Sequence, residues 1–182
     1  THRRPNLLTV TSVAPHKDNE TCIRALHLLI QDYPDTPWML TIVGGQSLSQ
    51  WDSLRQFAKQ KGIEDNVTFL GPISKIELAQ LMHESSCVVL TSRIESFCMI
   101  AIESMAAGCP VIVTNATSMP ESVGDAAILV DEGSSPQFAK AVQALHENPN
   151  SREKNVQLGQ ARASAFATGT FEISLESIIN ET

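Results

Sequence analysis

This 182-residue chain lacks several of the patterns that assign a protein to a class at sight. Its 13 lysines and arginines form no run and its net charge is -7, so nucleic acid is not expected as a partner. No apolar run reaches the roughly 18 residues that a membrane-spanning helix needs. A signal peptide is also missing, and we therefore expect the protein in the cytoplasm.

The cysteines contain no C-x-x-C pair, the spacing that is typical of metal and redox sites. Each one lies among apolar residues, so we predict buried, reduced thiols at Cys22, Cys87, Cys98 and Cys109. What is present is an ordinary globular composition, with 42% hydrophobic and 18% charged residues. The length suits one domain with a sizeable core. Because the first residue is not methionine, we expect a fragment or a processed chain.

Apolar runs of strand length alternate with longer helical patterns along the chain. Strands are predicted at 7–14, 38–45, 67–71, 87–92, 110–115 and 126–130. Helices are predicted at 20–32, 48–62, 75–84, 97–107, 119–123 and 136–181, the last broken near 148–150 and near Gly169. The alternation predicts an α/β fold: a Rossmann-like doubly wound parallel sheet of about six strands with helices on both faces. One domain would span 1–182, with closing helices over about 150–182.

Several helix ends carry a local signal. Ser74 and Glu77 have the spacing of a capping box, which predicts a helix start at residue 75. Gly62 and Gly108 follow helical patterns and predict their ends. The segment 171–182 has its apolar residues mainly on one face, which predicts an amphipathic closing helix that docks on another surface.

Polar or glycine-rich loops follow four of the predicted strands. They read PHKDN at 15–19, GGQS at 44–47, GPI at 71–73 and SRIES at 92–96. In a parallel sheet, ligands bind outside the carboxyl ends of the strands, so these loops predict a ligand cleft. An NAD-binding protein is disfavoured, because no G-x-G-x-x-G follows the first strand.

Two glutamates, Glu95 and Glu103, stand in an otherwise apolar run. Glu95 precedes a predicted helix whose first-turn amides, near 96–100, suit a phosphate group. Carboxylates repel an anion, so the two glutamates suit neutral hydroxyls, and a sugar nucleotide has hydroxyls on both sides of its phosphates. Lys17, in the loop after the first strand, could supply the positive charge.

Each of these three residues also has a simpler interpretation. Glu95 could merely complement the helix dipole. Glu103 could be paired with a buried arginine or histidine, because a lone buried carboxylate is costly. Lys17 could be a solvated surface lysine. The sugar-nucleotide hypothesis depends on their combination.

Glu95 and Glu103 also reproduce the E-x7-E motif of the retaining glycosyltransferases of family 4, which this chain resembles. Further segments resemble landmarks of that family in the same order: SVAPHKDNETCIRAL, LTIVGG, VTFLGPI, ELAQLM, ESMAAGCPVIVTN and PESVGDAAILVD. The resemblance covers roughly 7–148, and the tail is similar to the closing helices of the family. It implies the C-terminal, donor-binding half of an enzyme with two Rossmann-like domains, the GT-B fold.

The resemblance implies roles for individual residues. Lys17 and Glu95 would be catalytic, Lys17 by neutralising the leaving diphosphate and Glu95 by holding hydroxyls of the transferred sugar. Glu103 would hold the ribose hydroxyls. The remaining implied donor-binding residues would contribute backbone amides to the diphosphate, contact the base, or allow close approach to the backbone of the second loop. They are Gly44, Gly45, Gly71, Ile73, Ser96, Phe97, Cys98, Met99 and Ile100.

The implied activity is a retaining, hexosyltransferase-type transfer from a UDP- or GDP-linked sugar, in polysaccharide or glycoconjugate biosynthesis. The acceptor, a glycan or a lipid-linked glycan, would bind to an N-terminal domain that this chain lacks, so the chain alone would transfer little. That domain could also associate a cytoplasmic enzyme with a membrane. No Asp-x-Asp motif occurs, which agrees with a mechanism that needs neither metal nor cofactor.

The chain departs from the family pattern at three positions. Family members commonly have arginine where Ser12 stands, and its absence removes one diphosphate contact. Glycines are common at Ser96 and Cys98. Two alternatives therefore stay open: a non-catalytic relative that binds a nucleotide sugar, and a sugar-nucleotide epimerase or phosphorylase. The fold alone does not separate them.

Overall fold

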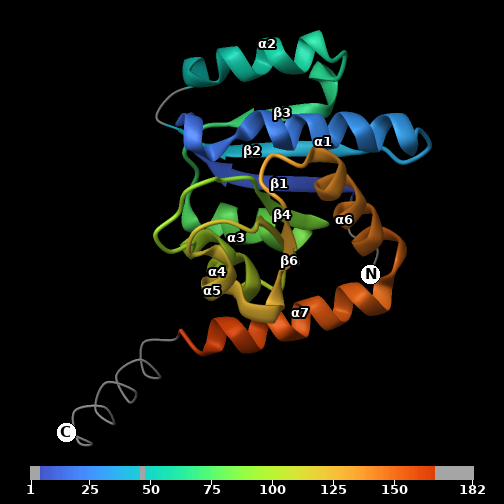
Figure 1. The fold of residues 1–182 in the computed structure, drawn as a ribbon. Coiled ribbons are helices and arrows are strands. Elements are labelled where there is room, and N and C mark those ends of the chain that lie inside the picture. The colour runs from blue at the N-terminus through green and yellow to red at the C-terminus, as the bar shows by residue number, and fades with distance from the viewer. Residues whose placement is uncertain (1–4, 46–47, 167–182) are drawn as a thin grey trace, which may run out of the picture.

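This computed structural model describes residues 5–45 and 48–166. Within these residues, six parallel strands form one sheet in the order β3-β2-β1-β4-β5-β6 (Figure 1). The strands are β1 (Asn6–Thr11), β2 (Met39–Gly44), β3 (Val67–Leu70), β4 (Cys87–Leu90), β5 (Val111–Thr114) and β6 (Ile128–Val130). The order reverses between β1 and β4, which lie side by side at the centre. The predicted Rossmann-like α/β fold is confirmed.

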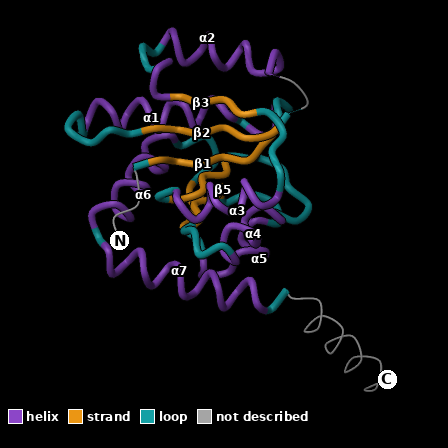
Figure 2. Tube along the Cα trace, turned by 180° about the vertical axis from the view of Figure 1, so that it is seen from behind, coloured by secondary structure: helices purple, strands orange, loops and turns teal. Residues whose placement is uncertain are grey.

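Helices cover both faces of the sheet. One face is packed by α1 (Asn19–Asp32), α2 (Asp52–Gln60) and α6 (Ser135–Glu147), and the other by α3 (Lys75–Glu84), α4 (Met99–Ala106), α5 (Met119–Val123) and α7 (Pro149–Ser164). Figures 1 and 2 show α7 crossing beneath α4 and α5. Strand β4 is buried on both faces, since Val89 belongs to one apolar cluster and Val88 to the other. Burial on both faces explains its continuous apolar sequence.

Local signals in the sequence account for several helix ends. The capping box forms: the Glu77 amide donates to Ser74 Oγ at 3.2 Å, and the Ser74 amide donates to Glu77 Oε2 at 2.8 Å. Hydrogen bonds from the side chain and the backbone of Ser74 to the Glu77 carboxylate lower the pKa of Glu77. Asn148 caps α7 by accepting from the Ser151 amide at 3.0 Å, which explains the predicted break near 148–150. Gly62 follows the end of α2 as expected.

Some predicted boundaries are wrong. The helix predicted from Phe97 begins at Met99, because the Met99 amide donates to the Phe97 carbonyl at 2.9 Å in a turn. Strand β1 ends at Thr11 rather than at residue 14, since the 3₁₀ helix η1 (Pro15–Lys17) follows. Another 3₁₀ turn, η4 (Gly124–Ala126), delays β6 to residue 128.

The closing part of the chain is described only as far as Phe166. Helix α7 ends at Ser164. The predicted break near Gly169 and the predicted amphipathic helix at 171–182 lie outside the described residues.

All four cysteines are free and buried, as predicted. Burial raises the pKa of Cys22 to about 12 and raises the pKa of Cys98, chiefly through desolvation. The thiol of Cys98 is therefore neutral at physiological pH. This matters for the site, because Cys98 immediately precedes α4 and a neutral thiol places no negative charge there.

Candidate functional site

Lys17 and Glu95 meet at the carboxyl ends of the two central strands. Lys17 lies in η1, after β1, and Glu95 lies in the loop after β4. Their ion pair joins Lys17 Nζ and Glu95 Oε1 at 2.6 Å, with the two side chains 22% and 19% exposed. Strand order reverses between β1 and β4, and such a switch point is where ligands bind in open α/β sheets. The sequence placed both residues at this edge, and the structure brings them into contact.

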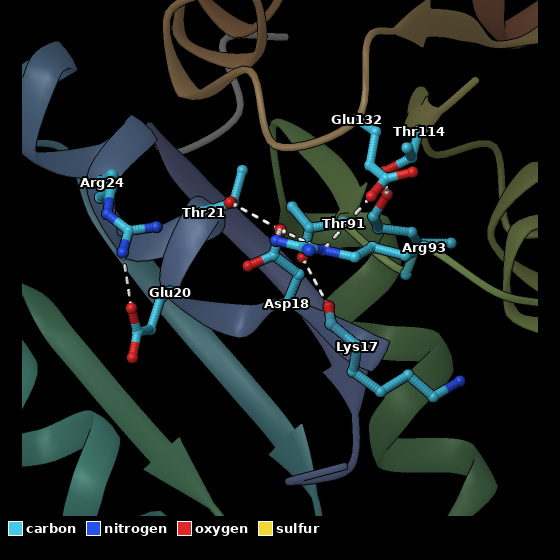
Figure 3. Close-up of polar contacts among 10 residues, drawn as sticks. Lys17, Asp18, Glu20, Thr21, Arg24, Thr91, Arg93, Thr114 and Glu132 are labelled. Atoms are coloured by element: carbon cyan, nitrogen blue, oxygen red, sulfur yellow. Dashed lines mark hydrogen bonds and ion pairs between the residues drawn. The ribbon is translucent and has the colours of Figure 1, made fainter. Parts of the chain in front are cut away.

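Two further bonds hold the lysine loop against the loop after β4. Thr91 Oγ1 donates to the Lys17 carbonyl at 2.9 Å (Figure 3). The Arg93 amide donates to the His16 carbonyl at 2.7 Å. The backbone of Lys17 is therefore fixed, and its ammonium group moves only by rotation of the side chain.

The Arg93 side chain strengthens the same junction. Its Nη2 and Nε atoms donate to Asp18 Oδ2 at 3.0 and 3.2 Å, and its Nε lies 3.6 Å from Glu132 Oε1. Thr21 Oγ1 donates to the same Asp18 oxygen at 2.9 Å. Figure 3 shows the Lys17 ammonium group pointing away from this cluster. Arg93 is thus occupied by carboxylates, and Lys17 is the cation directed at Glu95.

Helix α4 begins beside this pair and has features of an anion site. Its cap residue, Cys98, makes no side-chain capping bond. The amides of Cys98 and Ile100 have no hydrogen-bond acceptor among the residues that the structure describes. The Met99 amide, which was predicted to bind the diphosphate, donates to Phe97 in this structure. Two amides and the positive end of the helix dipole remain for an anion.

The simpler interpretations of Glu103 and Lys17 do not hold within the described part of the chain. Glu103 is exposed on α4, and its carboxylate has no hydrogen-bond or ion-pair partner there, so it is not paired with a buried arginine or histidine. The N-cap residue of α4 is Cys98 and not Glu95, whose carboxylate contacts Lys17. Lys17 is not a solvated lysine, since it is paired and mostly buried.

The glycines of the second loop have a structural reason. Gly44 has a φ of 123°, and a Cβ atom there would lie 2.1 Å from the Thr11 carbonyl oxygen of the neighbouring strand. The segment that lies close to Gly44 is thus the neighbouring strand β1. Gly45 follows with a φ of 73°. Gly71 and Ile73, both half-buried, lie in the loop between β3 and α3, at the same edge of the sheet.

Two residues that the sequence did not indicate hold the backbone of Glu95. Its amide donates to Thr117 Oγ1 at 3.0 Å, and its carbonyl accepts from Ser118 Oγ at 2.7 Å. Both lie in the loop between β5 and α5. Phe97 was also not expected to contact Phe166, with which it forms an edge-on ring contact at 5.3 Å. No spacing rule links positions so far apart in sequence, so only the fold reveals these contacts.

Two properties of the described residues bear on binding partners. None of the helices there combines the length and the apolar character that crossing a membrane requires. No group of three or more histidine, cysteine, aspartate or glutamate side chains is arranged there to hold a metal ion.

Comparison with known proteins places these features in a family. Residues 2–162 match the family model for glycosyl transferases group 1. D-inositol 3-phosphate glycosyltransferase of Paenarthrobacter aurescens is 31% identical over 164 residues, which are 88% of this chain and 40% of that protein. The enzyme of the same name from Pseudarthrobacter chlorophenolicus is 32% identical over 178 residues, which are 94% and 42%. The chain thus spans about two fifths of the curated relatives it matches.

Solved structures share the fold. HepE of Anabaena, crystallised in complex with UDP, superposes with a TM-score of 0.84 at 23% identity, over 99% of this chain and 50% of HepE. The C-terminal domain of a glycosyl transferase group 1 family protein, LpcC of Francisella tularensis, gives 0.74 at 26% identity, over 88% and 85%. Since the family model covers most of its length, this chain belongs to the group 1 glycosyl transferases.

Proposed function

We propose that the chain is the donor-binding domain of a retaining glycosyltransferase of family 4. It binds a nucleotide-diphosphate sugar, UDP- or GDP-linked, across the carboxyl ends of β1 and β4. The observation that carries this proposal is the Lys17–Glu95 pair beside the N-terminus of α4, which joins a cation, a hydroxyl acceptor and free amides in one place. The complex of HepE with UDP supports a uridine nucleotide.

Each part of such a donor has a partner of matching chemistry. The diphosphate is negative, and Lys17 and the α4 amides are donors to it. The transferred sugar offers hydroxyls, for which Glu95 is an acceptor. The ribose offers two more, and Glu103 is exposed and unpaired among the described residues. Stabilising charge on the departing diphosphate is the main catalytic contribution of this set.

Donor binding in this proposal exchanges one ion pair for two contacts. Lys17 turns from Glu95 to the diphosphate, and Glu95 turns to the sugar. Since the backbone of Lys17 is fixed by Thr91, only the side chains need to move. A donor that carries both a diphosphate and a sugar gives Lys17 and Glu95 each a new partner, whereas a nucleoside diphosphate gives a new partner only to Lys17.

The acceptor, a glycan or a lipid-linked glycan, binds to a separate N-terminal domain in this proposal. The chain spans about two fifths of its curated relatives, which leaves room for such a domain in the whole protein. Polysaccharide or glycoconjugate biosynthesis in the cytoplasm, with the second domain as the membrane contact, is the setting that this implies.

One observation favours a non-catalytic relative as the second candidate. Ser12, where family members commonly have arginine, offers no positive charge, and its carbonyl accepts from Asn19 Nδ2 at 2.7 Å. With one cation fewer, a nucleotide sugar could be bound without efficient cleavage. Binding of the donor without transfer by the whole protein would support this candidate.

Calorimetric titration with UDP-, GDP- and ADP-sugars tests the proposal. We expect one of these donors to bind more tightly than its nucleoside, with no loss when EDTA is present. Transfer by the whole protein, with the anomeric configuration of the product read by NMR, then tests retention. A protein that binds none of the three donors, or binds nucleoside and sugar nucleotide equally, would contradict the proposal.

A further inference from the structure

Thr117 has an unusual backbone conformation in the loop beside the site. In the described part of the chain, two residues other than glycine have a positive φ, Asp18 at 47° and Thr117 at 49°. This left-handed region is unfavourable for a β-branched residue such as threonine. Backbone strain of this kind gathers at functional sites, where neighbouring contacts maintain it. The contacts of Thr117 therefore indicate what the conformation serves.

The side chain of Thr117 contacts Glu95. Its Oγ1 accepts the Glu95 amide hydrogen at 3.0 Å, and the neighbouring Ser118 Oγ donates to the Glu95 carbonyl at 2.7 Å. Both backbone groups of Glu95 are thus bound by one loop. On the other side, the Glu95 carboxylate lies 2.6 Å from Lys17. The loop after β5 and the loop after β1 together determine where Glu95 lies.

Glycine would adopt the conformation of Thr117 with less strain, but it has no hydroxyl group to accept the Glu95 amide hydrogen. Threonine therefore provides a hydrogen-bond acceptor for Glu95 that glycine would lack. We propose that Thr117, assisted by Ser118, is a positioning residue that aims the Glu95 carboxylate at the sugar of the donor. This inference rests on the proposed function and extends it to the residues that set sugar affinity.

The test compares three substitutions at position 117, with UDP and UDP-glucose as probes. Thr117→Val keeps the β-branched shape and removes the hydroxyl, Thr117→Gly also relieves the strain, and Thr117→Ser keeps the hydroxyl. We expect Thr117→Val and Thr117→Gly to weaken the affinity for UDP-glucose about fivefold, the effect of losing one hydrogen bond. The affinity for UDP should change less than twofold. Thr117→Ser should bind both probes like the original protein.

A purely structural role for Thr117 would give a different pattern. Thr117→Val would then weaken UDP and UDP-glucose equally and lower the melting temperature, or Thr117→Ser would bind UDP-glucose as weakly as Thr117→Gly. Either result would overturn the positioning role and leave the proposed function standing. Failure of the unsubstituted protein to bind either probe or any other nucleotide sugar would overturn the proposed function, and this inference with it.

Discussion

Replacing Glu95 by glutamine should tighten the binding of a nucleoside diphosphate and weaken the binding of its sugar conjugate. In the structure Lys17 Nζ is 2.6 Å from Glu95 Oε1, and donor binding as proposed breaks this pair. Glutamine keeps the shape of the side chain and removes its charge. The lysine of the variant is therefore available to the diphosphate at lower cost.

The exposure of the pair sets the size of the effect. With side chains 22% and 19% exposed, the pair is neither fully solvated nor deeply buried. A pair of this kind contributes about 1 kcal/mol, which is about a fivefold tighter dissociation constant for UDP. High salt screens the pair, so the difference between the two proteins should shrink as salt is added.

Isothermal titration with UDP at low and high salt measures this effect. Glu121→Gln is the matched control, because it removes the same charge from an exposed residue of α5 near the loop that holds Glu95. We expect the control to change UDP affinity much less. If Glu95→Gln leaves UDP affinity unchanged or weakens it, the ion pair is not broken on binding, and Lys17 does not move to the diphosphate.

Three further predictions follow from the same geometry. Lys17→Ala should weaken UDP far more than uridine in calorimetry, and equal losses would exclude a phosphate role. Glu103→Ala should weaken UDP by roughly 1–3 kcal/mol and abolish the preference for UDP over 2′-deoxy-UDP; an unchanged affinity with a lower melting temperature would make Glu103 structural. Gly44→Ala should lower the free energy of unfolding by about 3 kcal/mol in urea titrations, because its Cβ atom would overlap the Thr11 carbonyl. The control Gly133→Ala, also at a positive φ but with open space around it, should cost only about 1–2 kcal/mol; equal costs would refute the steric reason.

Much of the architecture could be predicted from local patterns. The short helix at 119–123 and the start of α3 at residue 75 agree with the structure, because a proline in the first turn and a capping box are local signals. Strands such as 87–90 are apolar throughout because both faces are buried, and such a continuous apolar run predicts a strand. Parallel topology then placed the loops at one edge.

What could not be predicted depends on contacts between distant segments. The start of α4 was missed because the backbone turns at Phe97, whose ring packs against Phe166, a residue far away in the sequence. Sequence placed Lys17 and Glu95 at the same edge but said nothing about direct contact. Thr117 carried no signal at all, since its conformation follows from bonding to a loop on another strand.

Amide hydrogen exchange with and without UDP shows whether the nucleotide binds at the carboxyl edge of β1 and β4. We expect slower exchange at 94–102 and 15–18 when UDP is added, with a smaller effect at 71–74. A depression between α2 and β3, lined by Arg55 and Phe69, lies outside the proposed site and should not respond. Protection confined to that depression, or unchanged exchange at 94–102 under saturating UDP, would show that the nucleotide does not bind at this edge.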